Sequence, residues 1–280
     1  NRGWACADGS VLVQTVSLQT DAARPESLRR IETRILTRQE GQWAAYSYAW
    51  NDEQTDASLV GESGAELKLS VHDAGFDGGS RERTWRIPSR SECMGCHSRA
   101  ANWVLGLNTL QMNRDFDYGG TVDNQLRVLD HIGLFSKPLD SRAVDYGKLV
   151  DPYDETADLN DRARSYLHAN CSHCHVQDGG GNAKIELEIA TDDDETKLFD
   201  VSPLQGDFGI LDARLVAPGD PYRSVVLYRV SKLARGRMPR LGSSEVDGRA
   251  IAMLANPMET QMVDALGVRI GGRTLDEAPL

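Results

Sequence analysis

Two segments with the pattern Cys-x-x-Cys-His contain the residues of this chain best suited to chemistry. They are residues 93–97 and 171–175, and they use four of the five cysteines. The pattern is typical of covalent haem c attachment. Each thiol adds to one vinyl group of the haem, and the histidine becomes the proximal iron ligand. The sequence therefore predicts two covalently bound haem c groups, held through Cys93, Cys96, Cys171 and Cys174, with His97 and His175 as iron ligands.

Three other uses of the same cysteines fit less well. Two Cys-x-x-Cys pairs can bind a structural zinc, but such pairs rarely both carry a histidine at the next position. A thioredoxin-like redox pair requires a βαβ context and would not occur twice. Disulfides between the pairs leave the histidines unexplained. The fifth cysteine, Cys6, has no partner in the sequence and is expected to be a small buried apolar residue.

The distal iron ligands must come from the remaining histidines and methionines. Met238 precedes Pro239 late in the chain, as the distal methionine does in small cytochromes c, and is expected to bind the second iron. His173, between two motif cysteines, is expected to point away from the iron. For the first iron four possibilities stay open, namely Met112, His72, His131 or an open coordination position.

Composition limits the class of protein. The 280 residues carry a formal net charge of −11 at pH 7, which argues against binding to nucleic acid or an anionic membrane. No apolar run has the length of a membrane span. Because bacteria attach haem c outside the cytoplasm, we expect a periplasmic or extracellular protein. The abrupt opening at Asn1 indicates a domain cut from a longer chain.

The first third of the chain is predicted to be β structure. Five short β-branched or alternating runs are separated by Gly and Asp and favour a small antiparallel sandwich or barrel. The runs are residues 11–18, 31–37, 43–50, 66–71 and 84–87. Pro88 ends the last run, directly before the first motif.

The rest of the chain is predicted to be mainly helical. An amphipathic helix is expected over residues 124–132, with Leu126, Leu129 and Ile132 on one face. A linker is expected at 136–158, and a helix leading into Cys171. Further helices are expected at 222–234 and 246–266. The predicted fold class is thus α+β, with a β-rich domain (1–88), a first haem c region with linker (89–150) and a second, cytochrome-c-like haem c domain (151–280).

Longer stretches around the motifs resemble one family. Residues 85–97, 104–107 and 112–115, then 162–171 and 237–239, resemble bacterial dihaem c-type cytochrome modules with a β-rich N-terminal part; residues 31–34 and 50–55 also match. Such modules are often fused to sugar-dehydrogenase-like domains that use the quinone cofactor PQQ. Some members carry His where Gln111 stands here, which leaves the distal ligand of the first haem open.

The leading functional hypothesis is an exported electron-transfer module without a substrate of its own. It would pass electrons from a redox protein partner, or a fused dehydrogenase domain, to a downstream carrier. The alternative is a dihaem peroxidase with an open first haem. A third possibility is a binding module whose β-rich part docks a partner or carbohydrate through aromatic side chains such as Trp43 and Trp50. No Ser-His-Asp set, phosphate loop or dinucleotide fingerprint is present.

Overall fold

A computed structural model of the chain describes residues 2–72, 79–243 and 245–256. The chain forms two compact units. The first comprises residues 1–149, 169–181 and 238–245, and the second comprises 150–168, 182–237 and 246–280. An antiparallel β region at the N-terminus followed by helices confirms the α+β class at this coarse level. The expected domain limits at residues 88 and 150 stay predictions, but both Cys-x-x-Cys-His motifs belong to the first unit.

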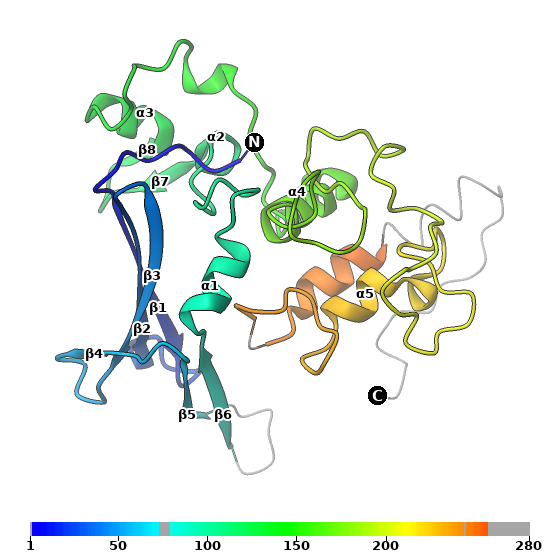
Figure 1. The fold of residues 1–280 in the computed structure, drawn as a ribbon, viewed down its shortest axis with the longest axis horizontal. Helices are drawn as coiled ribbons and strands as arrows, with labels where there is room; N and C mark the ends of the chain where they lie inside the picture. Colours follow the sequence, from blue (N-terminus) through cyan, green and yellow to red (C-terminus); the bar gives the residue numbers. More distant parts are fainter. Residues whose placement is uncertain (1, 73–78, 244, 257–280) are drawn as a thin grey trace. The chain divides into compact units, whose positions relative to one another are not determined.

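The first unit is built on an antiparallel meander of four strands. These are β1 (Val11–Gln19), β2 (Leu28–Gln39), β3 (Gln42–Trp50) and β4 (Ala57–Leu59), in that order across the sheet. Figure 1 shows β1 to β3 as long neighbouring strands. Glu40 and Gly41 both have positive φ at the β2–β3 turn, which suits the twist of a two-residue hairpin. The three long strands confirm the expected runs, whereas the short β4 was not predicted.

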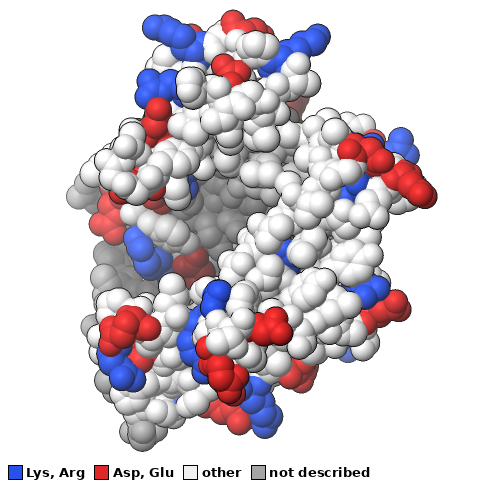
Figure 2. All heavy atoms as spheres, turned by 90° about the vertical axis from the view of Figure 1, so that its left-hand side faces the viewer, with Lys and Arg blue, Asp and Glu red and all other residues white. Residues whose placement is uncertain are grey.

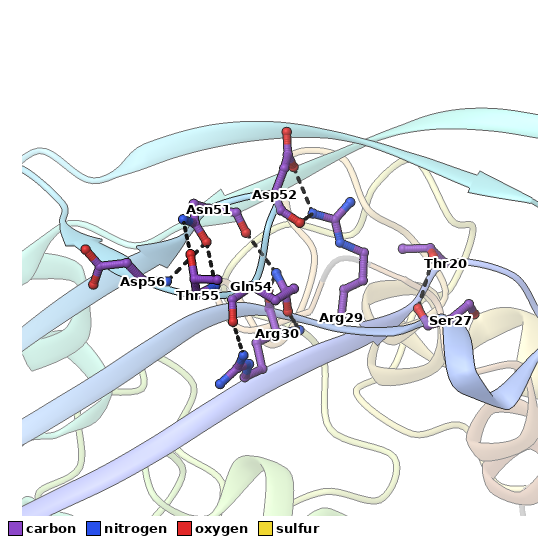
Figure 3. A network of polar contacts seen from close by, with 9 residues as sticks. All are labelled: Thr20, Ser27, Arg29, Arg30, Asn51, Asp52, Gln54, Thr55 and Asp56. Atoms are coloured by element: carbon purple, nitrogen blue, oxygen red, sulfur yellow. Dashed lines mark hydrogen bonds and ion pairs between the residues drawn. The ribbon is translucent and has the colours of Figure 1, made fainter.

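The loop between β3 and β4 is fixed by side-chain hydrogen bonds (Figure 3). The Asn51 Oδ1 atom accepts from the Thr55 backbone N–H at 2.9 Å. Gln54 bonds the backbone of Arg30 in both directions, at 2.7 Å to its N–H and 3.1 Å to its carbonyl. The Arg30 guanidinium also lies 3.7 Å from the centre of the Trp50 ring. These residues of the 50–55 segment therefore join the loop to the start of β2.

A separate hairpin joins the sheet to the first motif. It consists of β5 (Ala65–His72) and β6 (Ser80–Ile87), which pair from Ala65↔Ile87 to His72↔Ser80. His72 is the last residue of β5, where it pairs with Ser80 of β6, and its backbone N–H donates to the Thr20 carbonyl at 2.7 Å. Ile87 is fully buried, and Pro88 follows as expected. The predicted sandwich or barrel is thus a four-stranded sheet and a two-stranded hairpin.

Short elements follow the first motif. They are α1 (Arg90–Cys96), α2 (Thr109–Met112), β7 (Asp115–Asp117), β8 (Val122–Asn124), α3 (Gln125–His131) and the 3-10 turn η2 (Ala143–Asp145). The helix expected over 124–132 is α3, with Asn124 as its N-cap. Leu126 on the expected apolar face is buried, whereas Ile132, the C-cap residue, is 65% exposed.

The expected linker at 136–158 is partly a packed segment. The buried Asn113 side chain donates to the carbonyls of Ala143 and Tyr146, each at 2.9 Å. The Leu149 backbone N–H donates to the Leu110 carbonyl at 3.1 Å. Sequence composition does not reveal the Asn113 bonds, because the donor lies about 30 residues before the backbone carbonyls that accept them.

The second unit has its own core and contains most of α4 (Leu159–Cys171), the helix expected before the second motif. The helix predicted at 222–234 is shorter, with the 3-10 turn η3 (Pro221–Arg223) and then α5 (Val225–Val230). Residues 248–256 are helical, and the remainder of the helix expected to 266 lies outside the described residues. Buried apolar residues of this unit include Leu167, Ile185, Leu187, Leu198, Val216, Val225 and Leu254.

The expectation about partners excluded a membrane span and nucleic acid, and helix length and surface charge are the structural features related to it. None of the helices in the described part of the chain combines the length and apolarity needed to cross a bilayer. On the face in Figure 2, Lys and Arg alternate with Asp and Glu, so the described side chains there form no continuous field of one sign.

A capping box fixes the start of α1 directly after β6. The Ser89 hydroxyl accepts from the Glu92 N–H at 3.2 Å, and a Glu92 carboxylate oxygen accepts from the Ser89 N–H at 2.9 Å. Arg86 donates to the same carboxylate at 2.6 Å and lowers the pKa of Glu92. Since the folded-state pKa is lowered, this stabilisation is present at neutral pH and is lost as the pH falls through it.

Replacing Ser89 with Ala should lower the free energy of unfolding by about 1 kcal/mol, because α1 loses its N-cap acceptor. Thermal unfolding followed by circular dichroism measures this change. The control is Ser70→Ala, an exposed serine on β5, which should shift stability by less than about 0.5 kcal/mol. Equal stabilities of the two variants would contradict a role for the cap.

Candidate haem-attachment site

The first motif occupies the end of α1. Cys93 and Cys96 are three residues apart on this helix, and His97 is its C-cap. Residues at this spacing lie on the same side of a helix, so the two thiols and the imidazole leave α1 together. All five cysteines are free thiols, and burial raises the pKa of Cys93. The arrangement is a thiol pair with an adjacent imidazole, held at the end of a capped helix.

The orientation of His97 is set by a backbone carbonyl. Its Nδ1 atom lies 2.6 Å from the Trp103 oxygen, and an imidazole that donates from Nδ1 has its lone pair on Nε2. Trp103 is held in place at positive φ, with its own N–H donating to Ser98 at 2.8 Å. Burial lowers the pKa of His97, which favours the neutral ring. Metal-binding histidines are oriented by a second hydrogen bond of this kind.

A buried carboxylate lies beside the first motif. Glu32 on β2 has no exposed surface, and its Oε1 atom accepts from Arg34 and, at 3.2 Å, from Trp85 Nε1. Arg34 partly opposes the burial that raises the pKa of Cys93, and it adds to the burial that lowers the pKa of His97. Sequence reasoning did not place Glu32 or Arg34 at the site. The sequence feature that could have indicated this pair is the spacing of Glu32 and Arg34, which are two residues apart and therefore on the same face of a strand.

The second motif follows α4, which ends at Cys171. The N–H groups of Cys174 and His175 both donate to the Cys171 carbonyl, at 3.1 and 2.9 Å. The Gly181 N–H donates to the Cys174 carbonyl at 2.9 Å, so the chain folds back on the motif. Burial raises the pKa of Cys171 to about 12.

Two glycines after the second motif lie where a Cβ atom would overlap residues of that motif. A Cβ at Gly181 would lie 2.7 Å from His175 Nδ1, and one at Gly179 would lie 2.2 Å from the Cys174 oxygen. A Cβ at Gly180 would meet only the Gly95 oxygen, at 4.0 Å. The chain therefore packs closely on the second motif at Gly179 and Gly181, because only glycine permits this approach.

The fold brings the two motifs together. The ligand atoms of Cys96, His173 and Cys174 all lie within 4.8 Å of one another. A hydrogen bond between the two thiols lowers the pKa of Cys174 to about 7 and raises that of Cys96 to about 12. Sequence reasoning set His173 aside because a residue between the two motif cysteines was expected to point away from the iron. Nothing in the spacing places it beside a cysteine 77 positions away.

The candidate distal ligands lie in different settings. Met238 belongs to the same compact unit as both motifs and is half-buried. Met112, at the end of α2, is half-buried as well. His131 is exposed at the end of α3, and the exposed His72 contacts the Ser80 hydroxyl at 3.2 Å. The choice among these residues for the first iron stays a prediction.

Replacing Gly181 with Ala should disturb the second motif, because its Cβ would overlap His175 and the Cys174 carbonyl. Overpacking of this kind costs about 1–3 kcal/mol, so the thermal midpoint should fall by roughly 2–10 °C. The matched control is Gly180→Ala, whose Cβ has room, with a midpoint close to that of the parent chain. The same midpoint in both variants would show that this contact is not needed.

Comparison of the chain with protein-family models, with curated proteins and with solved structures gave no match in any of the three searches.

Proposed function

We propose that this chain carries two covalently attached haem c groups and serves as an exported electron-transfer module. The observation that carries the proposal is the His97 Nδ1 bond to the Trp103 carbonyl, next to the thiols of Cys93 and Cys96. This bond orients Nε2 as a metal ligand. A neutral oriented imidazole and two free thiols on one helix are the donor set that haem c requires, so the residues present fit the group.

Each residue of the two motifs has a distinct task. Cys93 and Cys96 would form thioethers with the first group, and Cys171 and Cys174 with the second. His97 and His175 would be the proximal ligands, and Met238 the distal ligand of the second group. Haem bound in this way supplies reversible one-electron chemistry at its iron. The Trp103 carbonyl makes the His97 ring more basic, and Glu32 holds Arg34 as a fixed positive charge near that ligand.

The finer assignments belong to the same proposal. Residues 89–150 would be the first haem region and 151–280 a cytochrome-c-like second domain. The chain would belong to the bacterial dihaem modules that it resembles. The electron donor would be a redox protein or a fused quinone-dependent dehydrogenase domain, in the periplasm or at the cell surface. Because α4 leads directly into Cys171, its end has the helix-to-motif arrangement of small cytochromes c.

The chain produced in a host with haem-attachment machinery should be heavier than the apoprotein by two haem masses. The haem should stay on the denatured chain in a gel, because thioether bonds survive unfolding. Mass spectrometry and haem staining measure both properties. A Cys93→Ser, Cys96→Ser variant should keep one haem. An unmodified mass in the parent chain would contradict the proposal.

Replacing Met238 with Ala should remove the sulfur-to-iron absorption band of the ferric second haem and lower its reduction potential, because thioether ligation favours ferrous iron. Met94→Ala, within the first motif but outside its ligand set, is the control. A spectroelectrochemical titration measures both haems. An unchanged band and potential would show that Met238 only packs in the loop.

The parent chain also tests the alternative function. Rapid carbon monoxide binding by half the haem, with peroxide turnover, would support the dihaem peroxidase.

A further inference from the structure

A second use of the motif residues follows from the cluster of Cys96, His173 and Cys174. Cys96 ends α1, whereas His173 and Cys174 lie in the loop after α4. Their sulfur and nitrogen ligand atoms lie within 4.8 Å of one another, and all three side chains are partly accessible. The set takes one cysteine from each motif and adds a histidine that haem attachment does not use.

The donor chemistry selects the ligand. Two sulfurs and an imidazole suit zinc and similar thiophilic cations, whereas magnesium and calcium prefer oxygen ligands. With metal–sulfur bonds of about 2.3 Å and metal–nitrogen bonds of about 2.0 Å, the ligand atoms of a tetrahedral site lie roughly 3.5–3.8 Å apart, which is inside the 4.8 Å limit that the three atoms share. A three-residue set also leaves a fourth position for water.

We propose that the chain with free thiols binds one thiophilic divalent cation, Zn²⁺ being the natural example, through Cys96, His173 and Cys174. This site does not depend on the haem proposal, because it needs only the unmodified side chains. The thiolate form of a cysteine is the form that binds metal. The Cys96 thiol releases its proton when the cation binds.

The two uses of the cysteines exclude each other. A thioether at Cys96 or Cys174 has no thiolate left to offer, so haem attachment at either motif would remove a ligand from the cation site. Conversely, one bound cation would hold a cysteine of each motif. The cation would therefore keep both cysteines from oxidation before attachment, and its release would have to precede the formation of the thioethers.

The test uses the full chain made without haem attachment and kept reduced, titrated with Co²⁺ as a spectroscopic probe. We expect one cobalt per chain, with the intense ultraviolet bands of thiolate-to-cobalt charge transfer and the visible bands of tetrahedral cobalt. One equivalent of Zn²⁺ should abolish them. Binding without these bands, or more than one cobalt bound with equal affinity, would overturn the proposal.

Variants identify the ligands. His173→Ala should weaken cobalt binding by at least about 10–100-fold, since even a supporting residue around a metal costs that much. His131→Ala, an exposed histidine on α3, is the matched control. Cys171→Ser removes a motif cysteine outside the cluster and should leave the affinity unchanged. If His173→Ala binds as tightly as the parent while Cys171→Ser loses binding, the cation sits in the second Cys-x-x-Cys pair and the proposal is wrong.

Two further measurements keep the outcomes separate. The far-ultraviolet circular dichroism of each variant shows whether the loss of cobalt affinity comes from unfolding. His173→Asn repeats the removal of the imidazole with a polar side chain, and it should lose cobalt affinity as His173→Ala does. The His173→Ala chain made with haem attachment should still gain two haem masses, because both Cys-x-x-Cys-His patterns are intact. Absent haem in that chain and in the parent would count against the proposed function alone, whereas unchanged cobalt affinity would count against the cation site alone.

Discussion

The buried carboxylate of Glu32 is the constraint around which the first motif is assembled. A fully buried charge costs several kcal/mol unless it is paired and hydrogen-bonded. Glu32 obtains its partners from its own strand, through Arg34, and from β6, through Trp85. Removal of one partner from such a pair typically costs about 3–5 kcal/mol. The pair therefore joins the sheet to the hairpin that leads into α1, so the position of Cys93 depends on the β-rich part.

The second motif, like the first, is held by the compact unit that contains the sheet. The boundary between the compact units runs through α4, so the end of this helix, with Cys171, belongs to the unit that contains the sheet. Glycines permit the chain after Cys174 to fold back on His175. Both motifs thus become parts of one packed structure, and His173, from the second motif, becomes a neighbour of Cys96. The proposed haem attachment and the proposed cation binding would therefore compete, because they would use the same cysteines.

Local sequence patterns predicted the strands and the main helices well. The alternation of Leu67, Leu69 and Val71 corresponds to β5, and the run before Cys171 to α4. Local patterns were wrong where tertiary contacts decide. Ile132 continues the apolar face of α3 but is exposed at the helix end. The polar segment around Ala143 looked like a linker, yet Asn113 satisfies its carbonyls.

The sequence by itself determined the reactive groups, since Cys-x-x-Cys-His spacing on a helix brings two thiols and an imidazole together through local geometry alone. It also determined the antiparallel β class, because alternation with period two is a local property. Only the tertiary structure decided that Trp103 orients His97, that Glu32 and Arg34 act on the first motif, and that His173 lies beside Cys96. These relations join residues distant in sequence or depend on loop backbone conformation, and they arise from burial and hydrogen bonding of the folded chain.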